Sequence, residues 1–353
     1  MAHIWVRAEQ REMEQRVGLT PQGAKALLDA GHQVTVEDSP ARAIPTDGYA
    51  KAGCVIAPAH SWPDAPSDAI ILGLKELDAD GPDLTHRHIM FGHAYKGQAD
   101  GPALLRRFRR GGGTLLDLEY LLDDTGRRIA AFGYWAGFAG AAIGMKAWIA
   151  QTSGTSLGAI GVYPGKTALL DELRKDLAAL PDAPAPAALV IGALGRVGSG
   201  ACDLCTALGL SVTRWDKAET ASGGPFPEIL DHEIFVNCIL ASPSVPVFVP
   251  AEAVAKARRL SVIADVSCDP SSSYNPIPIY HRSTTFADPL VRVTDSPVPL
   301  DVMAIDNLPS MLPAESSEDY ADQLLPYLED LDTDRTGVWK RAGAIYETHV
   351  SKV

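Results

Sequence analysis

The sequence predicts an α/β protein with two doubly wound domains, each built around a parallel β-sheet. A chain of 353 residues with 46% hydrophobic composition can bury a large core and exceeds the usual size of one domain. Short apolar runs alternate with helix-length segments in both halves, which is the pattern of parallel sheets covered on both faces. A glycine-rich turn at residues 192–198 follows one such run and indicates a dinucleotide-binding domain.

The N-terminal third shows this alternation most clearly. Thr20 and Pro21 have the residue types of a helix N-cap and a first helical residue, and Gly31 is placed to end that helix. Strands are predicted over residues 4–6, 33–36, 54–57, 69–74 and 89–92.

Three residues with charge or proton chemistry follow predicted strands of this first sheet. Arg7 follows the first strand, Lys75 follows Ile-Ile-Leu-Gly-Leu, and His93 follows Ile-Met-Phe-Gly. Parallel sheets bind ligands at the carboxyl ends of their strands, so these side chains are expected to face one crevice.

The composition changes after Arg128, where residues 130–142 are dense in small and aromatic side chains. We expect a helix here that packs very closely between two domains, and we place the first domain crossing at this point. A helix over residues 167–180 then leads to a stiff, proline-rich connector, residues 181–186.

The glycine turn begins the second domain. Gly192 can supply a tight turn, Gly195 can let the backbone approach a pyrophosphate, and Gly198 can let helix and strand pack closely. The usual G-x-G-x-x-G pattern has glycine where Leu194 stands, so an ordinary glycine-rich strand–helix corner remains the alternative. Asp216 ends the next apolar run, near the separation at which an acidic side chain binds the adenosine ribose.

Further strands are predicted over residues 189–191, 211–215, 233–240, 260–266 and 302–305, which makes a second doubly wound unit. Two terminal helices are predicted around residues 320–331 and 338–349. We expect both helices to pack on the first domain.

The composition narrows the functional classes. A net charge of −13 opposes non-specific binding to nucleic acid or anionic membrane, and no apolar run is long enough to span a bilayer. With no signal peptide evident, a cytoplasmic location is expected; the C-terminal Ser-Lys-Val only half resembles a peroxisomal address.

Cys202 and Cys205 form a C-x-x-C inside the predicted helix, where two buried structural thiols are favoured over a redox or metal site. No metal site is predicted.

Ten segments of the chain together carry a family resemblance; they are residues 7–9, 16–21, 73–76, 93–98, 126–128, 131–140, 192–196, 223–226, 275–280 and 305–310. The Gly-Leu-Lys-Glu, His-x-Tyr-Lys and Gly-Arg-Arg sequences that begin at Gly73, His93 and Gly126 are the most specific, whereas Arg16 with Leu-Thr-Pro is shared with the wider alanine dehydrogenase and transhydrogenase superfamily. Together the segments resemble the NAD-dependent, lysine-forming saccharopine dehydrogenases.

This resemblance implies two Rossmann-like doubly wound parallel-sheet domains with an active-site cleft between them. Residues 1–131 with 314–353 would form the substrate domain, and residues 132–313 the NAD-binding domain. It further implies an oxidoreductase that interconverts saccharopine with L-lysine and 2-oxoglutarate, often as a monomer.

The resemblance also implies roles for individual residues. Lys75 and His93 match the acid–base groups. The implied substrate contacts are Arg16, Gln98, Arg128, Phe132, Ser267 and Asp269, together with Arg11, which stands where relatives often have lysine. The implied NAD contacts are Arg127, Gly195, Arg196, Asp216, Thr220, Leu240, Val266, Ile305, Asp306, Asn307 and Leu308.

Two alternatives stay open. The chain could be another amino-acid or opine-type dehydrogenase of the same superfamily, or a non-catalytic NAD-binding protein that has kept the fold. Loss of the lysine or the histidine would favour the second alternative, and both residues are present.

Overall fold

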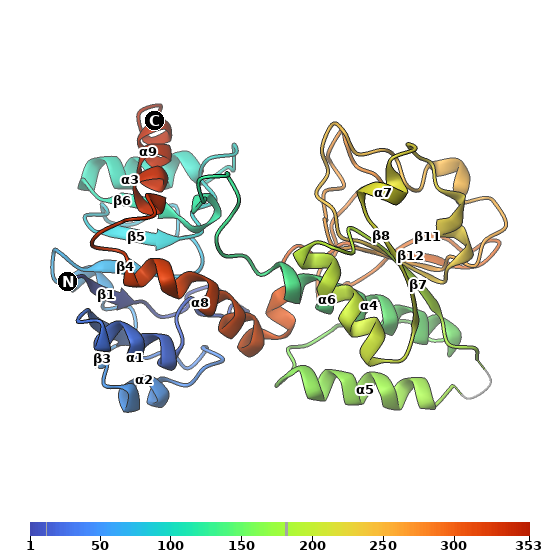
Figure 1. The fold of residues 1–353 in the computed structure, drawn as a ribbon, viewed down its shortest axis with the longest axis horizontal. Helices are drawn as coiled ribbons and strands as arrows, with labels where there is room; N and C mark the ends of the chain where they lie inside the picture. Colours follow the sequence, from blue (N-terminus) through green and yellow to red (C-terminus); the bar gives the residue numbers. More distant parts are fainter. Residues whose placement is uncertain (12, 181–182) are drawn as a thin grey trace. The chain divides into compact units, whose positions relative to one another are not determined.

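The chain, seen in a computed structural model, folds into two compact units (Figure 1). The first comprises Met1–Ala131 and Pro313–Val353, and the second comprises Phe132–Leu312. The structure describes residues 1–11, 13–180 and 183–353. The second unit is one continuous segment, whereas the first is completed by the last part of the chain.

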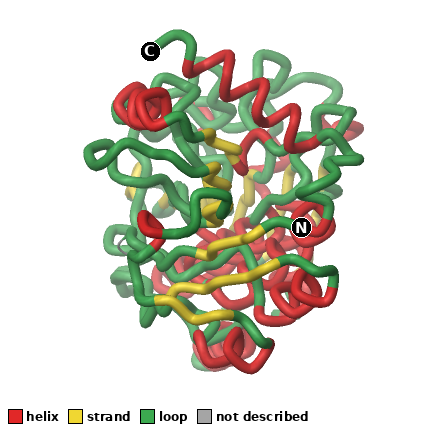
Figure 2. Tube along the Cα trace, turned by 90° about the vertical axis from the view of Figure 1, so that its left-hand side faces the viewer, coloured by secondary structure: helices red, strands yellow, loops and turns green. Residues whose placement is uncertain are grey.

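The first unit is built on a six-stranded sheet in the order β3-β2-β1-β4-β5-β6, in which every neighbouring pair is parallel. Five of the six strands were predicted; the short β6 follows three consecutive glycines and lacks a clear apolar run. In Figure 2, where this unit faces the viewer, the strands lie side by side among helices. The strands are β1 (His3–Val6), β2 (Gln33–Glu37), β3 (Val55–Ala57), β4 (Ile70–Leu72), β5 (Arg87–Met90) and β6 (Thr114–Asp117).

Helices cover both faces of this sheet. The first one begins as predicted, because the Thr20 hydroxyl accepts a hydrogen bond from the Gly23 N–H at 3.1 Å and Pro21 is the first helical residue. This helix, α1, packs against α2 and α8, while α3 packs against α9. The helices are α1 (Pro21–Asp29), α2 (Thr46–Ala52), α3 (Gly101–Gly111), α8 (Pro313–Glu329) and α9 (Val338–Val350).

Both terminal helices belong to the first unit. The Ser317 hydroxyl of α8 accepts a hydrogen bond from the Val17 N–H at 3.0 Å. The Tyr346 hydroxyl of α9 donates to the Gly113 carbonyl at 3.0 Å, just before β6. Tyr346 and Val350 also join the apolar cluster beneath α3, so the C-terminal segment completes the core of this unit.

The second unit also contains a six-stranded sheet, in the order β11-β12-β10-β9-β7-β8. This sheet is parallel as predicted except at one edge, where β11, a strand that was not predicted, runs antiparallel to β12. Residues 295–299 alone connect these two strands, which is too short for the crossover that parallel strands require. The strands are β7 (Ala187–Ile191), β8 (Ser211–Trp215), β9 (Ile234–Asn237), β10 (Val262–Asp265), β11 (Val291–Thr294) and β12 (Leu300–Met303).

The small-residue helix packs inside the second unit. It is α4 (Gly133–Thr152), longer than expected, and within this unit it packs mainly against α6 (Arg196–Ala207) and the sheet. A side chain at Gly137 would collide with the carbonyl oxygen of Val197, and one at Gly200 with that of Tyr134. Glycine at both positions therefore lets the two helix backbones approach closely.

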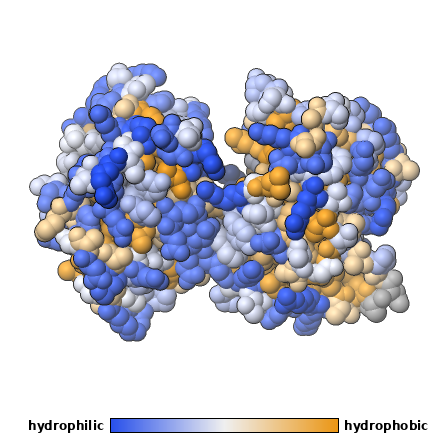
Figure 3. Space-filling model, viewed as in Figure 1, coloured by the Kyte–Doolittle hydropathy of each residue, from blue (hydrophilic) through white to orange (hydrophobic). Residues whose placement is uncertain are grey.

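The remaining helices of this unit are α5 (Lys166–Ala178), close to its predicted range, and the short α7 (Lys217–Thr220). The first two residues of the predicted connector, Pro181 and Asp182, lie outside the described residues. Within the described ranges, no helix has both the length and the apolar character needed to cross a membrane. On the face shown in Figure 3, hydrophilic residues cover most of each unit, with small groups of apolar residues among them.

Candidate active site

The carboxyl ends of β1, β4 and β5 bring Arg7, Lys75 and His93 to one edge of the first sheet. The chain order along this sheet reverses between β1 and β4, which is where doubly wound sheets bind ligands. Backbone hydrogen bonds continue past the strands: Arg7 N–H donates to the Leu72 carbonyl and Phe91 N–H donates to the Leu74 carbonyl, each at 2.9 Å. Lys75 directly follows Leu74, and His93 is two residues past Phe91.

Arg7 lies beneath Lys75. The Arg7 side chain is buried, and its guanidinium donates a hydrogen bond to the backbone carbonyl of Lys75. Burial lowers the pKa of Arg7 to about 10, although the nearby carboxylates of Glu9, Glu37 and Glu76 oppose this shift. The guanidinium occupies the space that a side chain at position 73 would need, and Gly73 leaves it open.

His93 is held by Glu76, which sequence analysis placed in a motif without assigning it a role. The Nδ1 atom of His93 lies 2.9 Å from Oε2 of Glu76, and Arg11 Nε lies 3.2 Å from the other carboxylate oxygen. Burial alone would raise the pKa of Glu76, but the His93 hydrogen bond and the charges of His93 and Arg11 lower it to about 2. The carboxylate therefore stays charged and orients the imidazole.

The backbone of His93 is unusual, with φ of 47°, in the left-handed region that non-glycine residues seldom adopt. The preceding residue, Gly92, donates its N–H to the buried carboxylate of Asp117 at 3.2 Å. Burial raises the pKa of Asp117 to about 6. A left-handed residue next to an exposed cavity is typical of functional sites.

A cavity of about 190 Å³ opens beside His93 and holds two predicted substrate residues, Arg11 and Gln98. Glu76 and Gly92 also line it. Arg11 spans this cavity and a smaller one that contains Arg7 and Lys75. The proton-chemistry residues and Arg11 are thus brought together around one edge of the sheet.

The other two arginines predicted to bind substrate, Arg16 and Arg128, differ in how exposed their side chains are. Arg16 is buried and donates two hydrogen bonds to Glu14, from Nε at 2.8 Å and from Nη2 at 2.7 Å. Arg128 is 38% exposed and lies 3.1 Å from Glu119, a carboxylate that it shares with Lys96. Neither Glu14 nor Glu119 was singled out from the sequence, because a lone carboxylate in a loop has no distinguishing pattern.

Two predicted residues lie where the chain leaves the first unit. The Arg127 N–H donates to the Asp123 carboxylate at 2.9 Å within a tight turn. Phe132 is the first residue of the second unit and immediately precedes α4.

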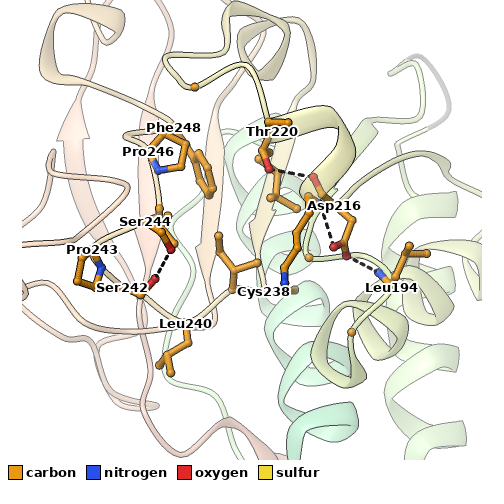
Figure 4. Close-up of a pocket in the computed structure, with 18 residues that line it drawn as sticks. Leu194, Asp216, Thr220, Cys238, Leu240, Ser242, Pro243, Ser244, Pro246 and Phe248 are labelled. Atoms are coloured by element: carbon orange, nitrogen blue, oxygen red, sulfur yellow. Dashed lines mark hydrogen bonds between the residues drawn. The ribbon is translucent and has the colours of Figure 1, made fainter.

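A second, larger cavity of about 900 Å³ lies at the glycine turn of the second unit (Figure 4). Gly192 has φ of 86°, and its N–H and that of Ala193 donate to the Trp215 carbonyl at 2.9 and 3.0 Å. Gly195 is the N-cap of α6, so the unpaired N–H groups of this helix start at the turn. A side chain at Gly198 would collide with the Gly192 carbonyl, which explains the third glycine.

Asp216 stands at the carboxyl end of β8 on the rim of this cavity. Its carboxylate accepts hydrogen bonds from the Leu194 N–H at 3.1 Å and the Lys217 N–H at 2.9 Å, so it joins the glycine turn to the start of α7. Figure 4 shows Asp216 and Thr220 on one side of the cavity and the loop from Leu240 to Phe248 on the other. Leu194 and Leu240 are 84% and 80% exposed.

Four of the predicted NAD contacts line this cavity, namely Gly195, Asp216, Thr220 and Leu240. The others do not. Arg196 is exposed at the start of α6, and Val266 follows β10 in the loop that also holds Ser267 and Asp269. Asp306 and Asn307 follow β12 between the buried Ile305 and Leu308. Cys238 and residues 242–246 also line the cavity. They were not predicted, because a Ser-Pro-Ser-Val-Pro loop carries no motif.

The cysteines in the C-x-x-C motif are buried and free. Burial raises the pKa of Cys202, and it raises the pKa of Cys205 to about 12. Over the described ranges, no group of three His, Cys, Asp or Glu side chains is placed to hold a metal ion.

Two doubly wound units, one with a proton-chemistry edge and one with a dinucleotide-type turn, define a dehydrogenase of the alanine dehydrogenase/PNT class. The family model of its N-terminal domain matches residues 5–139 and that of its C-terminal domain matches residues 228–351. A solved L-alanine dehydrogenase has the same fold, with a TM-score of 0.68 over 97% of this chain and 93% of that one, at 19% identity.

Within this class, the chain belongs to the saccharopine dehydrogenases. It is 46% identical to the NAD(+), L-lysine-forming saccharopine dehydrogenase of Yarrowia lipolytica over 361 residues, which cover 99% of this chain and 98% of that protein. The enzyme of the same description from Schizosaccharomyces pombe is also 46% identical and is covered over 99% of its length.

Proposed function

We propose that the protein is an NAD-dependent saccharopine dehydrogenase, which cleaves saccharopine oxidatively to L-lysine and 2-oxoglutarate and also catalyses the reverse reductive amination. The observation that carries this proposal is the placement of Lys75 and His93 after the adjacent parallel strands β4 and β5, beside the point between β1 and β4 where the strand order reverses. The full-length similarity to lysine-forming enzymes supports the choice of substrate.

The reaction explains why two proton-handling groups are needed. The secondary amine of saccharopine must be neutral before hydride can leave, and the resulting imine must then be hydrolysed with proton transfer to and from water. Lys75 extends from a backbone that Arg7 fixes, and His93 is oriented by Glu76. We assign these two side chains to the proton transfers.

The substrate has three carboxylates, and arginine forks suit them. Arg128 is exposed, and Arg11 lines the cavity beside His93 with Gln98. Arg16 is already paired with Glu14, so a substrate carboxylate there would share or replace that partner. Phe132, Ser267 and Asp269 complete the proposed substrate contacts.

We propose NAD as the cofactor, and the second unit fits it. A cavity of about 900 Å³, an exposed helix N-terminus and a carboxylate at the end of β8 match the needs of a dinucleotide. Asp216 can accept hydrogen bonds from both ribose hydroxyls and would repel a 2′-phosphate, so NAD is preferred over NADP. When bound, NAD accepts the hydride. Arg127, Arg196, Val266 and residues 305–308 would extend the contacts beyond the cavity.

An assay of NADH consumption with 2-oxoglutarate and a panel of amino acids tests the function. Preference for lysine is expected, with little turnover when NADPH replaces NADH. Preference for alanine or another amine would favour a different dehydrogenase of the superfamily. Cofactor binding without turnover of any amine would favour the non-catalytic alternative, and equal use of NADPH would contradict the role of Asp216.

We also propose that the protein works as a monomer on small molecules in the cytoplasm, without nucleic-acid or membrane partners. The net charge of −13 supports the last part, because it repels anionic polymers and lipid surfaces. Sedimentation at assay concentration tests the monomer.

A further inference from the structure

A buried polar cluster lies at the carboxyl ends of β9 and β10 in the second unit. Asp265 ends β10 and is paired in register with Asn237, which ends β9. The Tyr280 hydroxyl donates to Asp265 Oδ2 at 2.6 Å, and the Asn237 amide donates to Oδ1 at 2.9 Å. All three residues are at most 1% exposed. The cluster has no role in the proton chemistry proposed for the first unit.

The partners of Asp265 are hydrogen-bond donors. Besides Tyr280 and Asn237, the Cys268 N–H points at Oδ1 at 3.4 Å. Burial raises the pKa of Asp265, while these donors oppose the shift because they favour the charged carboxylate. Donors to both oxygens favour the ionised form of this buried carboxylate.

The other titratable groups around the cluster keep their protons near neutral pH. Burial raises the pKa of Cys268 to about 11, and it raises those of Cys238 and Tyr280 well above their usual values. Asp269 and Asp306 are the carboxylates that also act on this region, through Cys268. Of the three carboxylates Asp265, Asp269 and Asp306, only Asp265 is buried.

The topology places this charge on the nicotinamide side of the proposed cofactor site. The strand order of the second sheet reverses between β7 and β9, and a dinucleotide lies across such a point. Asp216, at the end of β8, fixes the adenosine half on one side. The other half therefore extends over the ends of β9 and β10, where Asn237 and Asp265 lie.

We propose that the buried carboxylate of Asp265 strengthens the binding of oxidised NAD+ relative to that of NADH. The nicotinamide ring is positively charged in NAD+ and neutral in NADH, so a nearby fixed negative charge stabilises the first and leaves the second nearly unchanged. Asp265 acts through charge rather than through contact with the reacting atoms, and is a positioning residue in this sense. The inference rests on the proposed function in requiring that the second unit binds NAD with its adenosine half at Asp216.

The test is the ratio of the dissociation constants of NAD+ and NADH, measured without substrate by NADH fluorescence and by competition with NAD+. In Asp265→Asn, this ratio should rise on the order of tenfold, because only NAD+ loses a favourable interaction. Asp301→Asn is the matched control: Asp301 is equally buried and accepts hydrogen bonds from Gln151 and Arg292, but it lies near the start of β12, away from the carboxyl ends. The control should keep the wild-type ratio.

Equal weakening of both cofactor forms in Asp265→Asn would overturn the proposal, because that is the result of a structural role alone. If this variant does not fold, Tyr280→Phe decides. Without the Tyr280 hydroxyl, the charged form of Asp265 loses one hydrogen-bond donor. As the pH is lowered, the relative strengthening of NAD+ binding should therefore be lost at a higher pH in this variant than in the wild type. An unchanged pH dependence would also overturn the proposal. Failure of the wild type to bind either form would instead contradict the proposed function itself.

Discussion

At the scale of single residues, the proposed acid–base pair makes the most direct prediction. Lys75→Met or His93→Gln should lower kcat by about 10²–10⁴, the usual contribution of general acid–base catalysis, while NADH still binds and the fold persists. One limb of the pH profile of kcat/KM should also flatten, because that profile reports the essential acid and base of the free enzyme. Near-normal turnover with an unchanged profile in both variants would make the pair structural.

Replacement of Arg128 should mainly affect substrate binding, whereas replacement of Arg16 should mainly affect stability. Arg128→Ala should mainly raise the KM for 2-oxoglutarate, by a factor equivalent to about 1.5–3 kcal/mol, with little change in thermal stability. Arg16→Ala leaves the buried carboxylate of Glu14 without its ion pair and should lower the free energy of unfolding, by about 3–5 kcal/mol. Steady-state kinetics and thermal denaturation of both variants give the comparison; equal stability of the two would be evidence against the buried pair.

His88 should make stability depend on pH. Its ring packs edge-on against Trp62 and Phe108, and within the described part of the chain its nitrogens have no hydrogen-bond partner. Burial, with the charges of Arg7, His86 and Arg107, holds the pKa of His88 well below its usual value. Below about pH 6.5 the unfolded chain therefore binds a proton that the folded chain does not, and stability falls as pH decreases.

His88→Phe tests this source of pH dependence. The variant should lose less thermal stability than the wild type between pH 7 and pH 5, because its side chain cannot bind a proton. An identical loss in both proteins would assign the pH dependence to other groups.

Single residues were predictable from sequence where a strand end or a motif fixed their place. Both routes predicted that Lys75 and His93 follow strands of the first sheet, and the structure places them past the ends of the adjacent strands β4 and β5. Glu76 and Glu14 were not found as partners, because which arginine or histidine a carboxylate meets depends on loop paths that no local pattern records. Asp265 was missed because it reads as the polar end of an apolar strand.

At the scale of elements, alternation of apolar runs and helical segments gave most strands. This alternation did not predict the edge strand β11 or the full length of α4. The edge strand β11 has half-buried residues and no apolar run. Helix α4 extends past its predicted end because most of its residues are apolar and buried on every side, so no amphipathic boundary marks it.

The crossing of α4 and α6 should be intolerant of a single methyl group. Gly137→Ala would drive a side chain into the Val197 carbonyl and should destabilise the protein by about 1–3 kcal/mol. Gly343→Ala in α9, where a side chain meets nothing within 4 Å, should be neutral or stabilising because alanine favours helix. Denaturant unfolding of the two variants makes the comparison; a neutral Gly137→Ala would contradict the close packing.

At the scale of the whole molecule, two units with separate cores should respond differently to cofactor. At a concentration 100 times its dissociation constant, NAD should stabilise the native state by about 2.7 kcal/mol. Hydrogen exchange should slow chiefly in β7, α6 and α7, which surround the large cavity, and little in α9. Protection confined to residues 1–131 would show that the cofactor binds elsewhere.

The order of the two units along the chain also affects how the protein folds while it is being synthesised. The second unit is one uninterrupted segment, so it can close as soon as Leu312 has left the ribosome. The first unit begins earlier, but Phe108 and Leu115 share their apolar cluster with Tyr346 and Val350, near the end of the chain. Until those last residues are translated, this part of the nascent protein keeps an uncovered hydrophobic surface, which is where a chaperone would bind.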